Sequence, residues 1–123
     1  MKKLSILMII SISICCLIGC GESDSKASTK AISCANSAIE IGENYLSGNT
    51  DYSSTYNDIE EIQDELAYID DLTSDDKNYF SDQMIQIHIM SLSIDLITDN
   101  KEGTSDSYDK VQEDIDTLKE DIK

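Results

Sequence analysis

The sequence predicts an all-α protein, a small antiparallel bundle of three or four helices that follows an N-terminal signal peptide. Beyond residue 29, apolar side chains recur every three or four positions in four separate stretches, which is the spacing of one face of a helix. The chain contains no proline and only five glycines, so it has few residues that interrupt helices.

Residues 1–19 have the parts of a secretory signal peptide. The positive pair Lys2 and Lys3 precedes an apolar run from Leu4 to Ile18. As a helix, this run would extend about 22 Å, which is short of the roughly 30 Å hydrocarbon core of a bilayer. Its length therefore favours a cleaved signal over a membrane-spanning anchor.

The signal ends in the four residues Leu17, Ile18, Gly19 and Cys20. They resemble the lipobox of bacterial lipoprotein precursors, in which an apolar residue stands three positions before a cysteine and a small residue directly before it. The resemblance implies that a diacylglyceryl group is attached to Cys20, that cleavage follows Gly19, and that the mature chain begins at Cys20. Two or more acyl chains hold a protein stably on a bilayer, so the expected location is the extracytoplasmic face of the cell membrane.

The lipobox leaves two questions open. The membrane could belong to a Gram-positive surface or face a periplasm, and the released signal could itself act as a signalling peptide. Neither alternative changes the expected domain organisation, which is a signal peptide in residues 1–19, a lipidated cysteine with a flexible linker in residues 20–29, and an acidic helical domain in residues 30–123. The linker is polar and small, with a typical end-to-end distance of about 17 Å.

The mature chain is strongly acidic. Loss of residues 1–19 removes two of the nine basic residues and none of the 25 acidic ones, so the formal charge moves from −16 to −18. Such a charge disfavours nucleic acid as a partner and favours cations, cationic peptides or basic proteins. Solubility is the simpler explanation of the same charge.

The first two helices are expected over residues 28–47 and 51–72. In the first, alanines and Gly42 on the inner arc would allow a close approach by another helix. The second has an apolar seam, and its opposite side is acidic. The candidate cation-binding face consists of Glu60, Glu61, Asp64 and Glu65.

The third helix, expected over residues 74–98, has two apolar stripes on different sides. The first stripe contains Phe80, Met84, Ile87, Met90, Ile94 and Ile97, and the second contains Ile85, Ile89, Leu92 and Leu96. A helix of a small bundle normally buries one arc, so the second stripe needs cover from other helices of this chain, a second copy, a partner or a membrane. We take the second stripe as the candidate interface, on condition that it is exposed in the monomer.

A fourth helix is expected from Thr104 or Ser105 to near the C-terminus. It carries a narrow apolar seam of coiled-coil type, made of Tyr108, Val111, Ile115, Leu118 and Ile122.

The sequence predicts no catalytic residue, no metal ligand and no cofactor. His88 is the only histidine and is expected in a polar stripe, so a zinc site lacks ligands. Cys34 is expected to be a small buried hydrophobe, with an intermolecular disulfide or a reactive thiol as alternatives. The acidic turns lack the glycine-centred pattern of a calcium loop.

These features together predict a protein that is not an enzyme. The expected function is a membrane-anchored extracytoplasmic lipoprotein that acts as a helical protein-interaction module, through a protein partner or self-association. The alternative is an acidic binding lipoprotein that captures a cationic ligand or peptide. Strong dependence on salt would mark the alternative, because exposed charges are screened by ions.

Overall fold

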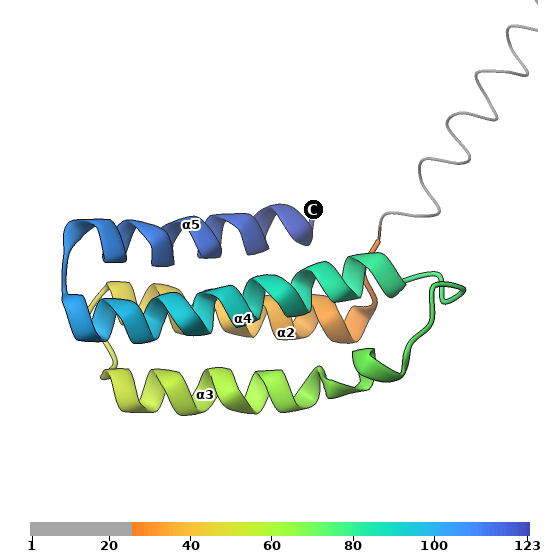
Figure 1. Cartoon of the computed structure of the whole chain (residues 1–123), viewed down its shortest axis with the longest axis horizontal. Coiled ribbons are helices and arrows are strands. Elements are labelled where there is room, and N and C mark those ends of the chain that lie inside the picture. The colour runs from red at the N-terminus through yellow and green to blue at the C-terminus, as the bar shows by residue number, and fades with distance from the viewer. Residues whose placement is uncertain (1–25) are drawn as a thin grey trace, which may run out of the picture.

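The computed structural model describes residues 26–123, which form a bundle of four α-helices and one short 3₁₀-helix. The helices are α2 (Thr29–Leu46), α3 (Tyr52–Glu65), α4 (Tyr79–Glu102) and α5 (Ser105–Asp121), and the 3₁₀-helix η1 (Ala67–Asp71) follows α3. Consecutive helices are antiparallel, so the start of α2, η1, the start of α4 and the C-terminus lie at one end of the bundle (Figure 1). The prediction of a small all-α bundle is confirmed, and residues 26–123 contain no strand.

The first turn of α2 is capped by Ser28, whose Oγ accepts a hydrogen bond from the N–H of Ala31.

Small residues allow α2 to lie close to α5. Gly42 is so close to α5 that a Cβ atom there would lie 2.8 Å from Ile115 Cδ1. The close approach predicted at Gly42 is confirmed, and α5 is the helix that approaches.

The second predicted helix is two elements in the structure, because the chain tightens at Leu66. The α-helix ends at Glu65, and η1 follows it. Leu66 and Ile69 are both fully buried. A 3₁₀-helix has about three residues per turn, which places two side chains three positions apart on the same side. The tighter turn thus directs both side chains into the core.

The third helix begins and ends later than the sequence pattern predicts. Residues 73–78 form turns, and α4 begins at Tyr79. It continues to Glu102, where Gly103 has a left-handed backbone conformation with φ of 58°. Glycine adopts this conformation without steric cost, so it ends the helix. Thr104 then caps α5.

The core is built around α4, which contacts α2, α3, α5 and η1. We call the fully buried row on α4 the inner stripe; it consists of Ile85, Ile89, Leu92 and Leu96. Burial of a side chain of this size stabilises the fold by about 1.5–3 kcal/mol relative to exposure. The inner stripe is therefore a main source of stability for the bundle.

A buried carboxylate joins the starts of three elements. Asp82, in the first turn of α4, is 1% exposed. It accepts hydrogen bonds from the N–H and the hydroxyl of Ser28, each at 2.7 Å, and from the hydroxyl of Tyr68 at 2.9 Å. Ser28 caps α2 and Tyr68 belongs to η1. These donors replace water around the buried carboxylate and thereby fix the end of the bundle where α2 begins.

Gly42→Val is expected to lower the free energy of unfolding by about 1–3 kcal/mol, because the added methyl groups must displace the buried Ile115 side chain. Chemical denaturation followed by circular dichroism measures the change. Ser37→Val, at an exposed position of the same helix, is the matched control and is expected to change this free energy by less than about 0.5 kcal/mol. Equal effects of both substitutions would contradict the close packing of α2 on α5.

Candidate functional site

Most of the large exposed apolar side chains of residues 26–123 gather on one side of α4, which we call the outer face. It consists of Phe80, Met84, Ile87, Met90 and Ile94, whose side chains are between 45% and 68% exposed. The half-buried Ile97 continues the row. At about 1.5 Å per residue, the row from Phe80 to Ile97 is about 26 Å long.

The outer face lies on the opposite side of α4 from the inner stripe. At about 100° per residue, Ile87 and Ile89 point in nearly opposite directions from the helix axis. The chain has no Lys, Arg, Asp or Glu from Gln83 to Ile94. A helix that is apolar all round is normally buried on all sides, whereas α4 leaves its outer face uncovered. An apolar row of this size is typical of an interaction surface.

The candidate interface predicted from the sequence required an exposed stripe, and that prediction is wrong because the stripe is buried. Its residues Ile85, Ile89, Leu92 and Leu96 are each 0% exposed. They cannot meet a partner in this fold, because α2, α3 and α5 already cover them. The other stripe, from Phe80 to Ile97, is the one that the bundle leaves open.

A groove between α3 and α4 adjoins the outer face. It has a volume of about 320 Å³ and is lined by Tyr56 and Gln63 of α3 and by Gln86, Met90, Ser93, Ile94 and Ile97 of α4. Its walls therefore combine apolar side chains with uncharged groups that can donate or accept hydrogen bonds. The groove can receive large apolar side chains and is too small and open to enclose a large molecule.

The four acidic residues predicted as a cation-binding face are all exposed, but they do not form one cluster. These residues are Glu60, Glu61, Asp64 and Glu65. A hydrogen bond to the Glu60 carboxylate raises the pKa of Tyr56, so Glu60 lies at the border of the groove. Glu65 instead turns toward α2 and accepts a hydrogen bond from the thiol of Cys34, with Sγ and Oε2 3.6 Å apart.

Cys34 is a buried residue, as the sequence analysis expected. It is 3% exposed and packs in the core. Burial, and after it the hydrogen bond to Glu65, raise the pKa of the Cys34 thiol. A raised pKa disfavours the thiolate, which is the nucleophilic form. The arrangement therefore favours a structural role for this cysteine.

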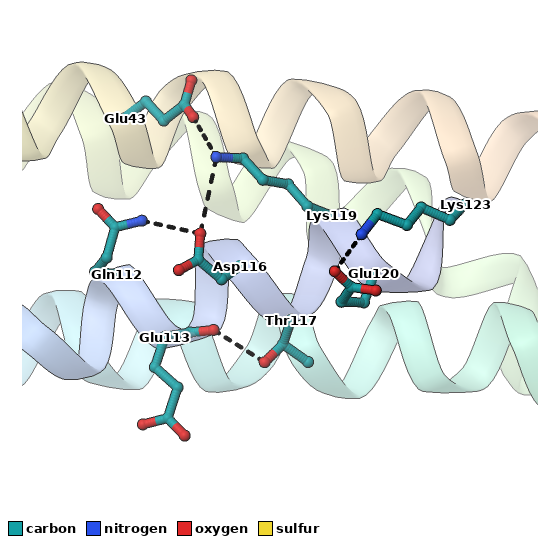
Figure 2. Close-up of polar contacts among 8 residues, drawn as sticks. All are labelled: Glu43, Gln112, Glu113, Asp116, Thr117, Lys119, Glu120 and Lys123. Carbon is teal, nitrogen blue, oxygen red and sulfur yellow. Dashed lines mark hydrogen bonds and ion pairs between the residues drawn. The ribbon is translucent and has the colours of Figure 1, made fainter.

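A second acidic surface, which the sequence analysis missed, lies on the exposed side of α5. It is a shallow depression of about 470 Å³ lined by Asp109, Gln112, Glu113, Asp116, Thr117 and Glu120. Figure 2 shows that lysines partly neutralise it: Lys119 Nζ lies 2.7 Å from Glu43 Oε1 and 3.8 Å from Asp116 Oδ1, and Lys123 pairs with Glu120. The helical spacing of the four acids is the sequence signal that could have found this surface.

Polar side chains line one side of the contact between α4 and α5. His88 Nδ1 lies 2.5 Å from Asp121 Oδ2, and the Ser91 hydroxyl donates to Asp114 Oδ1 at 3.0 Å. His88 is thus the histidine of a polar stripe, as expected, and the structure gives it a carboxylate partner. The two pairs fix the register of α5 on α4.

Asp114, an acid of this contact, has a raised pKa. Burial, followed by the neighbouring Asp95 carboxylate, raises the pKa of Asp114 to about 7, although Ser91 and His88 act in the opposite direction. Its Oδ2 atom is buried without a hydrogen-bond partner among residues 26–123. Two carboxylates close together in a partly buried site cannot both be ionised without cost. The contact therefore favours a proton on Asp114 near neutral pH.

Three further observations concern metal binding, membrane-spanning helices and the predicted lipidation site. Within residues 26–123, no group of His, Cys, Asp or Glu side chains is arranged to hold a metal ion. None of the helices in the same range is long and apolar enough to cross a membrane. The predicted lipidation site Cys20 and cleavage position Gly19 lie outside the described residues.

Comparison with known proteins gives no relative. No protein-family model, curated protein or solved structure matches this chain.

Asp114→Asn is expected to remove part of the pH dependence of stability. The pKa of Asp114 is raised on folding, so the folded state keeps a proton that the unfolded chain releases, and stability falls as pH rises from about 4 to about 7. After allowance for partial exposure, the substitution should raise the free energy of unfolding at pH 8 by about 1–2 kcal/mol and have little effect near pH 4. Urea denaturation across this pH range measures the change.

The matched control for this prediction is Asp116→Asn, an exposed acid on the same helix. It is expected to leave the pH dependence of stability close to that of the unaltered protein. If Asp114→Asn has the same pH profile as the control, Asp114 does not carry a raised pKa in the folded state.

Proposed function

We propose that this protein is a lipoprotein anchored to the extracytoplasmic face of the cell membrane, where the outer face of α4 binds a helical segment of a partner protein. One observation carries the docking role: a row of large apolar side chains, from Phe80 to Ile97, is left uncovered by the bundle. Covering apolar surface is favourable by about 25 cal/mol per Å². A partner that covers this row would gain that energy without any rearrangement of the core.

The lipobox resemblance supports the anchor, and the position of α2 gives its consequence for the orientation of the bundle. Residues 21–28 separate Cys20 from Thr29, the first residue of α2. This short linker would hold the starts of α2 and α4 and the C-terminus on the membrane side (Figure 1). The outer face would then extend away from the membrane, from Phe80 toward Ile97.

The anchor is tested by replacing the cysteine that carries it. In bacterial cells fed an alkyne-labelled fatty acid, the unaltered chain is expected to incorporate the label and to partition with membranes. Cys20→Ser is expected to incorporate no label, because a serine has no thiol for the thioether bond to the diacylglyceryl group. Cys34→Ser is the matched control and should be labelled like the unaltered chain. Labelling that persists in Cys20→Ser would refute the anchor.

The docking role is tested by photo-crosslinking at the outer face. A benzoylphenylalanine side chain at position 87, in cells that naturally make the protein, is expected to form a discrete adduct with one protein, identified by mass spectrometry. The same group at position 37, which is exposed on α2, is expected to form none. Equal adducts from both positions, or adducts with lipid alone, would contradict a protein-binding outer face.

The second candidate function is capture of a cationic ligand by acidic surface alone. The depression on α5 favours it, because four acidic residues line it and only part of their charge is matched by Lys119 and Lys123. Binding of this kind would depend on α5 acids and would not require the outer face of α4.

A further inference from the structure

We propose that the segment bound by this protein is a cationic amphipathic α-helix that lies in the groove between α3 and α4. Its apolar side would contact Met90, Ile94 and Ile97, and its basic side chains would meet Glu60 and Asp64 of α3. This inference rests on the docking role proposed above and names the chemistry of the partner.

The shape of the surface fits one helix. The groove runs between Tyr56 and Gln63, which lie about two turns apart on α3, and the apolar row of α4. An amphipathic helix presents apolar side chains every three or four residues, which is the spacing of Met90, Ile94 and Ile97 on α4. Met90 adds adaptability, because an unbranched thioether side chain can adjust to different neighbours. The groove is therefore suited to a helix whose apolar side chains enter it in a row.

The charges around the groove favour a basic partner. The α4 wall carries no charge between Gln83 and Ile94, while α3 contains five acidic residues and no basic one. Glu60 borders the groove beside Tyr56, and Asp64 lies one turn further along the same side of α3. Within residues 26–123, neither carboxylate forms an ion pair. Lysines or arginines along the edge of a bound helix would supply the missing partners.

A second copy of this chain fits the same surface less well. Two copies joined through this surface would bring two acidic chains together, because each chain has a formal charge of −16 even before the signal is removed. Charge complementarity therefore favours a basic helix over self-association.

The test uses the full chain in phosphatidylcholine vesicles and three designed peptides of about 18 residues, or five helical turns. The probe peptide has leucines on one side and lysines on the other, with one leucine replaced by its diazirine analogue. A second peptide has glutamates in place of the lysines, and a third has the probe composition in scrambled order. The measured quantity is the fraction of protein crosslinked on irradiation, with the crosslinked residues located by mass spectrometry.

The leucine–lysine helix is expected to crosslink to the outer face of α4 and to the groove, at least about tenfold more than either other peptide. Met90→Gln with Ile94→Gln should lower its crosslinking about tenfold. Glu60→Gln with Asp64→Asn should lower it about fivefold at low salt and less at high salt, because ions screen exposed charges. The matched control, Asp116→Asn with Glu120→Gln, removes the same charge from α5 and should change crosslinking less than twofold.

Any other result contradicts the inference, and each result shows whether the cationic partner or the docking role is wrong. If the glutamate peptide binds as well as the probe, the partner is not cationic, although the apolar docking role stands. If the scrambled peptide binds equally, the interaction is unspecific attraction to acidic residues. If only the α5 control weakens binding, the peptide binds the acidic depression on α5, which is the second candidate function. If no peptide binds and position 87 crosslinks to a second copy of the chain, the occupant is that copy. If no peptide binds and position 87 forms no adduct in cells, both the inference of a cationic helix and the docking role of the outer face are wrong.

Discussion

The inner stripe of α4 is apolar and is stable only when it is shielded from water, so the other helices pack around it. α2 can approach closely because most of its buried residues are alanines or Gly42, and α5 can approach because Ile115 fits over that glycine. α3 covers a third side and tightens into η1 so that Leu66 and Ile69 also reach the core. Once three sides of α4 are covered, residues 26–123 contain no further helix to cover the fourth side. The outer face is thus a consequence of how many helices these residues form.

Polar contacts determine the alignment of helices that apolar burial alone leaves free to slide. Asp82 binds the starts of α2 and η1 to the start of α4, and the pair of His88 with Asp121 aligns α5 on α4. Apolar contact is non-directional, whereas these hydrogen bonds require particular atoms at short distance. The chain uses carboxylates for this purpose even though it is already acidic. The raised pKa of Asp114 is the electrostatic cost of that choice.

Periodicity predicted the number, order and approximate bounds of the helices, since each has an apolar side that repeats every three or four residues. It could not decide which stripe of α4 is core, because both stripes have the same spacing and the outcome depends on where other helices lie. A weak signal was present in composition. The inner stripe contains only Ile and Leu, whereas the outer face includes Phe80, Met84 and Met90. The break at Leu66 and the α5 depression also depended on tertiary packing and surface shape.

The position of the proposed anchor gives the outer face a direction. A linker of about 17 Å would keep the start of α2 near the bilayer, and the start of α4 lies at the same end of the bundle (Figure 1). The apolar row would then begin near the membrane at Phe80 and run outward along the helix axis. A helix bound in the α3–α4 groove would lie along the same direction, because the groove walls are the two helices themselves. A short tether restricts rotation of the bundle, so the groove would be presented to partners in a narrow range of orientations, which lowers the entropic cost of binding.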